Sequence, residues 1–210
     1  MQPLVLDLDN DGVETTHLKE GAYFDHGSDG FAEQTGWAAA DDGILVMDRN
    51  GDGIINDGKE LFADQTILKN GTKAAHGFAA LAEWDENTDG KIDSADTIWS
   101  RLAVWQDIDG DGYAAPDEVY SLDDIGIKAI TLGYTNTNLP DANGNTVAHQ
   151  GTFIRTDDTT GTMANFSFQR DLVHTIATDY LDVPDAIASL PDIQGYGTVY
   201  DLHQAMVRDT

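Results

Sequence analysis

Cysteine is absent from this chain of 210 residues, which excludes disulfides, zinc–thiolate sites and thiol catalysis. No run of about 18 apolar residues occurs, so we expect no membrane-spanning helix. No apolar segment follows a basic start, so we expect no Sec-type signal peptide. Lys and Arg are scarce, 11 against 38 Asp and Glu, and the net charge is −27. Because phosphate and anionic lipid surfaces require a cationic partner, this balance excludes ordinary nucleic-acid or anionic-membrane binding.

Aspartate and glycine, in contrast, are abundant. Asp outnumbers Glu by 31 to 7, and glycine occurs 21 times. Glu suits helices better, whereas Asp is the short carboxylate of turns and of oxygen cages around hard cations. Apolar residues make up 40%, enough to build a core. The composition therefore indicates a folded, loop-rich protein of one large or two small domains, with much of its negative charge facing bound ions.

One short motif recurs, Asp-x-(Asp/Asn)-x-(Asp/Asn)-Gly. It places three oxygen-bearing side chains on alternate residues before a Gly that permits a sharp turn, and an acid at position 12 closes the cage around one cation. Two copies have the closing acid in register. In the copy at 85 the candidate ligands are Asp85, Asn87, Asp89, the Lys91 carbonyl, Asp93 and Asp96. In the copy at 107 they are Asp107, Asp109, Asp111, the Tyr113 carbonyl and Glu118.

Three further copies depart from the motif. At 48 the candidate ligands are Asp48, Asn50, Asp52, the Ile54 carbonyl, Asn56 and Glu60. Lys59 occupies position 12 there, so Glu60 needs one inserted residue to reach the ion, and Asp57 is the alternative. At 7 the candidates are Asp7, Asp9 and Asp11, and Glu14 or a distant acid must complete the site. The weakest copy offers Asp25, Asp29 and Glu33.

Calcium suits these ligands best. They are hard oxygens, offered in excess on flexible loops, whereas magnesium prefers few protein ligands in a rigid octahedron. A single copy is often only an Asx-turn, but several in one chain favour metal binding, and we predict about three to five Ca²⁺ ions. Carboxylates a few ångströms apart repel by roughly 1–4 kcal/mol per pair. We therefore predict a chain that is loose in low calcium and compact at extracellular calcium.

The hydrophobic pattern predicts a mixture of short elements. It indicates strands at 3–8 and 44–47, a strand-like segment at 102–105, and helices at 77–84, from 94 to about 101, and at 116–125. Apolar runs at 127–134, 146–156 and 162–169, separated by turn residues, predict β-hairpins. Amphipathic helices are predicted at 171–181 and 198–208, with a short helix between Pro184 and Pro191.

These elements predict an α+β fold, a loop-rich calcium-stapled module with an EF-hand-like helix–loop–helix core, C-terminal β-hairpins and a helical tail. We divide the chain into an Asp/Gly-rich calcium-loop region (1–75), an EF-hand-like core (76–125), a β-hairpin region (126–169) and a helical appendage or the start of a next domain (170–210).

Five segments occur in a characteristic order, namely Pro3–Thr15, Thr35–Trp37, Asp41–Asp48, Glu60–Phe62 and Leu102–Trp105. This series resembles the calcium-dependent self-processing module of large bacterial RTX (hemolysin-type calcium-binding) proteins, over about residues 3–169. The resemblance implies type I secretion, a secreted or cell-surface location in a bacterium, folding on meeting extracellular calcium, and neighbouring domains of a larger polypeptide as partners.

The resemblance also implies a reaction. In that family calcium triggers cleavage of an Asp-Pro bond at the N-terminal edge of the module, where the Asp carboxylate attacks its own carbonyl carbon. The resulting cyclic anhydride is hydrolysed, or a lysine amine of another protein captures it as an isopeptide crosslink. The corresponding junction here is Gln2-Pro3. Because a neutral amide cannot form the anhydride, we expect this chain as given not to cut itself.

Several functions remain open at this point. The main hypothesis is a non-enzymatic calcium-binding module of a secreted RTX protein, and the alternative is a calcium-triggered autoproteolytic module. The chain has no Gly-Gly pair, so it is not the glycine-rich β-roll itself. No Gly-x-Ser-x-Gly, HExxH or P-loop supports a hydrolase acting in trans. An adhesin using surface aromatics is a fourth hypothesis, but Trp84, Trp99 and Trp105 have core-like spacing and we predict that they are buried.

Overall fold

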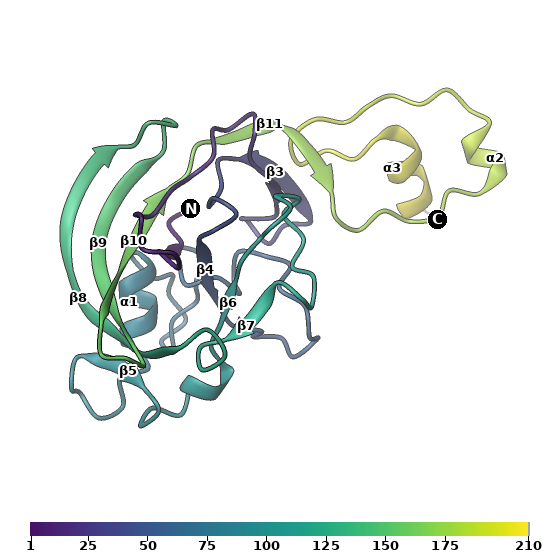
Figure 1. Cartoon of the computed structure of the whole chain (residues 1–210). Helices are drawn as coiled ribbons and strands as arrows, with labels where there is room; N and C mark the ends of the chain where they lie inside the picture. The colour runs from purple at the N-terminus through teal and green to yellow at the C-terminus, as the bar shows by residue number, and fades with distance from the viewer. Residues whose placement is uncertain (210) are drawn as a thin grey trace.

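The computed structural model describes residues 1–209, and its regular structure is mostly β-strand. Eight strands form one antiparallel sheet in the order β5-β8-β9-β10-β1-β4-β6-β7, and three form a small sheet in the order β11-β3-β2 (Figure 1). The strands are β1 (Leu4–Leu6), β2 (Tyr23–Phe24), β3 (Phe31–Thr35), β4 (Gly43–Val46), β5 (Lys91–Asp93), β6 (Ala103–Trp105), β7 (Val119–Ser121), β8 (Ile127–Pro140), β9 (Thr146–Arg155), β10 (Thr160–Ser167) and β11 (Arg170–Ala177).

Helices are few and short. They are α1 (Gly77–Ala82), the 3₁₀-helix η1 (Trp99–Arg101), α2 (Asp185–Ala188) and α3 (Leu202–Arg208). The longest, α3, has seven residues, and no helix within residues 1–209 could cross a bilayer. Helix α1 lies inside the curve of the long strands β8, β9 and β10, where it covers one face of the sheet (Figure 1).

The core lies on both faces of the central strands. Leu4 and Leu6 of β1 belong to an apolar cluster with Phe78 and Phe153, while Val5 points to a second cluster with Trp105. Strand β4 alternates in the same way, because successive side chains of a strand point to opposite faces. Burial on both faces explains why these two strands are continuously apolar rather than alternately polar.

The three predicted β-hairpin strands are confirmed as β8, β9 and β10. Asn143 and Gly144 form part of the turn between β8 and β9, where Gly144 has φ +85°, and residues 156–159 connect β9 to β10. Strand β10 then pairs with β1, so the end of the hairpin region is joined directly to the beginning of the chain. This pairing places the first residues of the chain in the middle of the sheet.

The predicted α+β fold class is wrong, because the chain is mostly antiparallel β and has no EF-hand helix–loop–helix core in its described residues. Helix α1 precedes the loop at 85, and residues 91–93 within this loop form β5, which pairs with β8 through the fully buried Ile92. The helix predicted at 94–101 is reduced to turns and η1. The nine residues between β5 and β6 contain η1 and turns but no α-helix.

Two further helix predictions are wrong. Residues 116–125 contain β7, which extends the main sheet by pairing with β6. Residues 170–177 form β11, which pairs with β3, because the exposed edge of β3 offers backbone groups that a β-branched segment can satisfy. The helices near the C-terminus are confirmed, since α2 lies between Pro184 and Pro191 and α3 lies within 198–208.

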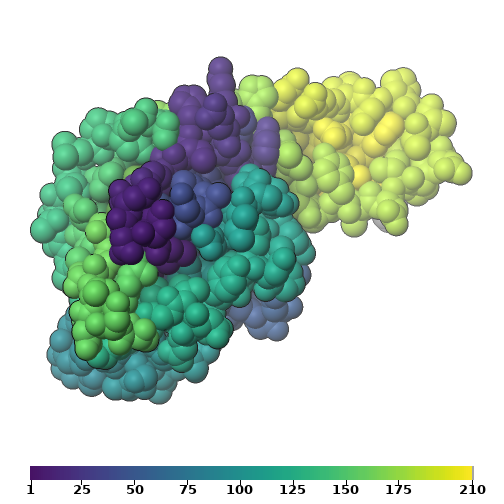
Figure 2. Space-filling view, viewed as in Figure 1, coloured from purple at the N-terminus to yellow at the C-terminus, as the bar shows by residue number. Residues whose placement is uncertain are grey.

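The C-terminal segment projects from the body of the molecule. Beyond β11 the chain runs out into a lobe that contains α2 and α3, and this lobe extends to one side of the sheet (Figures 1 and 2). The lobe meets the body at the loop of residues 25–30, where the Thr178 amide donates to the Gly30 carbonyl over 2.9 Å. The division of the chain at 75, 125 and 169 stays a prediction.

Candidate metal centres

Three Asp-rich loops share one pattern of hydrogen bonds from the loop backbone to the first aspartate. Asp48 accepts from the amides of Gly51 (2.6 Å) and Gly53 (2.9 Å), which are positions 4 and 6 of that loop. Asp85 accepts from positions 5 and 6, and Asp107 from positions 4, 5 and 6. The loop backbone is therefore wrapped around the carboxylate at position 1, as the motif predicts.

The acid at the far end of each loop repeats a second pattern. Glu60 accepts from the amides at position 2 (3.3 Å) and position 9 (2.9 Å) of its loop. Asp96 makes the same two contacts over 2.9 and 3.0 Å, and Glu118 makes them over 2.9 and 3.2 Å. These acids are at most 7% exposed. In the loop at 48, the structure brings Glu60 rather than Lys59 or Asp57 to this closing place.

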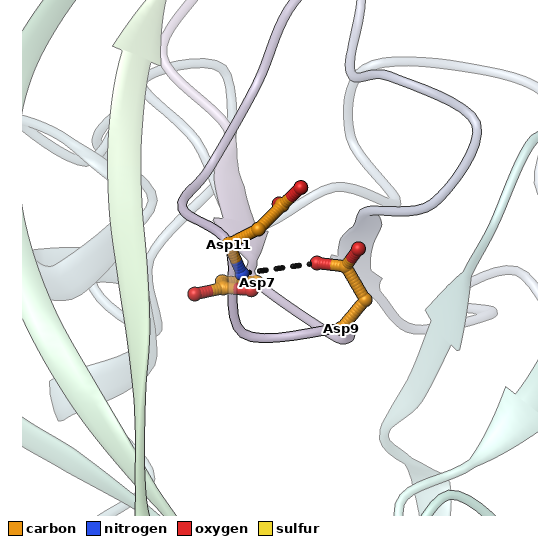
Figure 3. Close-up of side chains that lie close together, drawn as sticks. All are labelled: Asp7, Asp9 and Asp11. Atoms are coloured by element: carbon orange, nitrogen blue, oxygen red, sulfur yellow. Dashed lines mark hydrogen bonds between the residues drawn. The ribbon is translucent and has the colours of Figure 1, made fainter.

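Three groups of carboxylates offer oxygens that lie within 4.8 Å of one another in the described chain. They are Asp7, Asp9 and Asp11; Asp48, Asp52 and Glu60; and Asp107, Asp109 and Glu118. The first group gathers at the turn that follows β1, where the Asp11 amide donates to the Asp9 carboxylate (Figure 3). Such groups could hold a metal ion, because several anionic oxygens at this spacing match the coordination shell of a hard cation.

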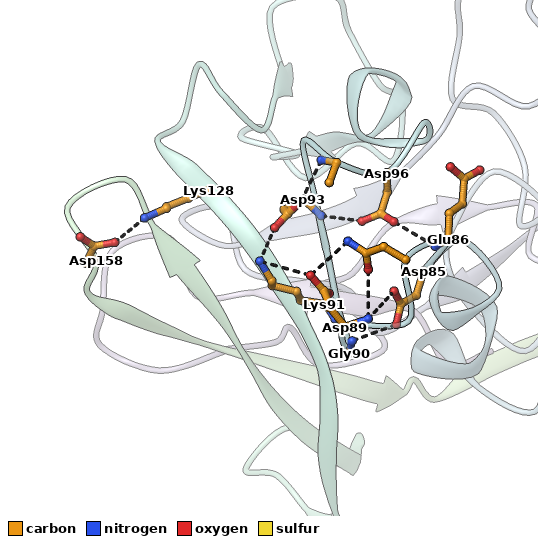
Figure 4. Close-up of polar contacts among 11 residues, drawn as sticks. Asp85, Glu86, Asp89, Gly90, Lys91, Asp93, Asp96, Lys128 and Asp158 are labelled. Atoms are coloured by element: carbon orange, nitrogen blue, oxygen red, sulfur yellow. Dashed lines mark hydrogen bonds and ion pairs between the residues drawn. The ribbon is translucent and has the colours of Figure 1, made fainter.

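The loop at 85 is arranged differently, although its sequence fits the motif best. No three of its carboxylates gather within 4.8 Å in the described structure. The Lys91 ammonium lies beside Asp93 and 3.5 Å from Asp89, so that a lysine neutralises part of this cluster (Figure 4). This ion pair lowers the pKa of the Asp93 carboxyl. The metal sites predicted here and in the other loops stay predictions.

The loop at 25 is a partial copy. Asp25 accepts from the amides of Asp29 (3.1 Å) and Gly30 (2.7 Å), and Glu33 accepts from the His26 amide over 3.1 Å. The Arg170 guanidinium lies 3.5 Å from the Glu33 carboxylate, so a positively charged side chain stands beside the last acid of this loop. Within the described residues these acids form no group of three at metal-binding distance.

Burial gives these carboxylates an electrostatic cost. Desolvation raises the pKa of Asp107, and the neighbouring Glu118 and Asp111 charges raise it further against the hydrogen bonds from the loop backbone. Desolvation is also the main cause of the raised pKa of Glu60, Asp25 and Glu33. A cation among these acids would stabilise their charged forms, since an opposite charge within a few ångströms favours ionisation.

Sequence reasoning did not single out Asp42, which is the most perturbed acid of the described chain. Asp42 is 1% exposed, and its burial raises its pKa to about 8. One carboxylate oxygen accepts from the Glu14 amide over 2.6 Å, which ties it to the loop at 7, and the other has no hydrogen-bond partner. Asp42 lies in the segment Asp41–Asp48, which contributes to the family resemblance, but the pairing of β4 with β1 that places it beside the loop at 7 cannot be read from the residues.

The Gln2-Pro3 junction is ordered. The Gln2 amide donates to Asp64 over 3.0 Å, and the fully buried Asn165 side chain donates to the carbonyls of Gln2 and Pro3. The Asn165 oxygen in turn faces His149 Nδ1 at 3.0 Å. The chain therefore holds the carbonyl groups on both sides of this bond at defined places beside β10.

The tryptophans lie mostly in the core. Trp37 and Trp105 are at most 1% exposed, and Trp99 is 8% exposed. Trp84 is partly buried and packs against the apolar cluster around Phe78, with the Lys69 ammonium 4.3 Å from its ring centroid. The burial predicted for Trp99 and Trp105 is therefore confirmed, whereas Trp84 is only partly buried at the edge of the core, and this placement weakens the case for an adhesin.

An antiparallel β-protein whose strand ends carry acidic loops able to hold metal ions is the class that the fold and these sites define. A family model described as "SPM domain" matches residues 4–169, and the chain belongs to this family. The chain is 43% identical over 205 residues to the iron-regulated protein FrpA of Neisseria meningitidis serogroup C. That alignment covers 97% of this chain and 18% of the relative. These matches support the link to RTX proteins that the sequence motifs indicated.

Proposed function

We propose that this chain is a calcium-binding module of a secreted or cell-surface bacterial RTX protein, and that it folds fully when it meets extracellular calcium. The proposed ligands are the acids and carbonyls of the loops at 7, 48, 85 and 107, with the loop at 25 as the weakest candidate. The proposed partners are Ca²⁺ and the neighbouring domains of a larger polypeptide.

The observation that carries this proposal is the repeated geometry of the acidic loops. In the loops at 48, 85 and 107 the last acid accepts from the backbone amides of the same two positions, 2 and 9, and two of these loops also gather three carboxylates within 4.8 Å. Repulsion among such acids costs roughly 1–4 kcal/mol per pair without a cation. Each ion bound to the folded state alone adds about 2.7 kcal/mol at a hundredfold excess over its dissociation constant.

Calorimetric calcium titration with direct ion counting tests the proposal. We expect about three to five ions per chain, a rise in folded structure by circular dichroism, and a higher melting midpoint in millimolar calcium than in EDTA. A matched variant, Asp107→Asn with Glu118→Gln, should bind one ion fewer. Identical melting curves in EDTA and calcium, together with no bound ions, would refute the calcium-binding function.

A second candidate function is the calcium-triggered cleavage of the bond between residues 2 and 3. It is supported by the Asn165 amide, which donates to the Gln2 carbonyl and would polarise it toward attack. In this chain Gln2 has no carboxylate to form an anhydride, so the proposal concerns the site and not the reaction of the chain as given. With an aspartate at this position, captured anhydride would crosslink to a lysine of another protein.

The test installs the missing nucleophile. A Gln2→Asp variant carrying a short upstream extension should be cut between residues 2 and 3 after calcium is added, with a shift on a denaturing gel and the expected mass of each fragment. Gln2→Asn with the same extension is the matched control and should stay whole, because it has the shape of aspartate without the carboxylate. An uncut aspartate variant at saturating calcium would sink this second candidate.

A further inference from the structure

The acidic loop at 7 lacks a closing residue of its own, which distinguishes it from the loops at 48, 85 and 107. Position 12 is Leu18, and Asp9 and Asp11 are exposed. Only Asp7 is buried, at 4% exposure, and its carboxylate accepts from the Asn10 amide over 2.7 Å. In the other three loops a buried acid lies at the closing position, whereas Glu14, the candidate within this loop, is exposed beside Asp11, so a buried acid for this loop would come from elsewhere in the fold.

The sheet supplies such an acid. Strands β1 and β4 pair with Val5 opposite Ile44 and Leu6 opposite Gly43, and Asp7 and Asp42 are the next residues beyond this last pair. Opposed residues of an antiparallel pair have Cβ atoms about 4.5–5.5 Å apart. Continuing the register by one step would bring the two buried carboxylates to the adjoining ends of two central strands, and the Asp7 charge contributes to the raised pKa of Asp42.

The hydrogen bonds of Asp42 leave one oxygen free at this place. Its Oδ2 accepts from the Glu14 amide over 2.6 Å, which joins the Asp42 carboxylate to the end of the loop at 7. Its Oδ1 is buried and has no hydrogen-bond partner. A buried carboxylate oxygen without a donor is costly, and the nearby charges of Glu14 and Asp7 raise the cost of ionising it further. A cation between Asp7 and Asp42 would remove both costs.

We infer that Asp42 is the ligand that closes the metal site of the loop at 7, supplied by the neighbouring strand β4 rather than by the loop itself. The site then consists of Asp7, Asp9 and Asp11 from one side and the buried Asp42 oxygen from the other. The inference rests on the proposed calcium-binding function and adds to it a ligand from outside the motif. It also implies that this ion joins the end of β1 to the beginning of β4, which are neighbouring central strands of the sheet.

The experiment compares the full chain with Asp42→Asn and with Asp182→Asn, in which an exposed acid of the C-terminal lobe is changed. Ion counting and calorimetry should show that Asp42→Asn has lost one calcium ion, or binds it at least tenfold more weakly, whereas Asp182→Asn matches the wild type. The double variant Asp9→Asn with Asp42→Asn should lose no more than that one ion, because both residues hold it. Loss of two ions, or unchanged binding by Asp42→Asn, would overturn the inference.

Melting curves separate a ligand from a merely structural carboxylate. In EDTA the Asp42→Asn variant should melt no lower than the wild type, because burial disfavours ionisation of the Asp42 carboxyl and the amide has no charge to bury, and in calcium it should gain less. Equal losses in EDTA and in calcium would mean that Asp42 only supports the Glu14 backbone.

If the asparagine variant does not fold, Asp42→Glu keeps the charge and displaces the oxygen, and unchanged calcium affinity in that variant would overturn the inference. A wild type that binds no ions at all would instead refute the proposed function.

Discussion

At the scale of single residues, His76 shows how a hydrogen-bond pattern assigns a protonation state. Its Nδ1 accepts from the Ala79 amide at the start of α1 over 3.3 Å, and its Nε2 lies 3.2 Å from the Tyr134 hydroxyl. A ring nitrogen that accepts carries no proton, so the neutral imidazole with its proton on Nε2 fits this place. Burial and the neighbouring His149, 4.3 Å away between ring centroids, lower the pKa of His76.

This geometry predicts a loss of stability in mild acid. The unfolded chain takes up a proton at His76 near pH 6.5, whereas the folded chain resists it until a lower pH. The contribution of the neutral His76 to the free energy of unfolding should therefore be complete above about pH 6.5, and it should be lost as the pH falls through the lower pKa of the folded chain. His76→Asn keeps a side-chain acceptor for the helix start and cannot be protonated, so it should flatten this fall.

Thermal melts between pH 7.5 and 5, at saturating calcium, measure the effect. The exposed His17→Asn is the matched control and should follow the wild-type curve, because its ring caps no helix. A His76→Asn curve with the wild-type slope would contradict the assignment of the neutral imidazole.

At the scale of elements, the sequence predicted those parts of the fold whose signals are local. The hairpins of β8, β9 and β10 have their apolar runs and turn residues in sequence, and the strand pattern at 44–47 corresponds to β4. The Asp loops were likewise readable, because the motif contains its own turn glycine. Gly112 shows the detail, with φ +76° and an added Cβ that would lie 2.5 Å from the Tyr23 carbonyl oxygen.

The elements that were missed depend on pairing between distant segments. Residues 170–177 are compatible with a helix by periodicity, but the free edge of β3 makes them a strand. Residues 91–93 lie within the predicted calcium loop at 85, where no strand was predicted, but pairing with β8 makes them β5. Asp42 was missed for the same reason, since nothing in the local sequence tells that β4 lies beside β1.

At the scale of the whole molecule, the acidic loops stand at joints between segments that are far apart in the chain. The loop at 7 follows β1, which pairs with β4 and with β10, near the end of the hairpin region. The loop at 48 follows β4 and the loop at 107 follows β6, and these two strands pair. Ions bound at these loops would therefore stabilise the central strand pairs rather than separate parts of the chain.

The net charge of −27 supplies a competing explanation, in which calcium stabilises the chain only by screening its negative charges. If calcium acted only by screening, any salt would replace it, since the Debye length falls to about 3 Å at 1 M ionic strength. Exposed acids such as Asp9 would be screened, but the buried Asp7, Asp42, Glu60, Asp107 and Glu118 would be screened much less.

In EDTA, 1 M NaCl should raise the melting midpoint by less than 2 mM calcium does in dilute buffer. Magnesium at 2 mM is the matched divalent control, and because it prefers few protein ligands in a rigid octahedron, it should also raise the midpoint less. Equal midpoints in sodium, magnesium and calcium would mean that general charge screening, and not coordination in the loops, holds the sheet together.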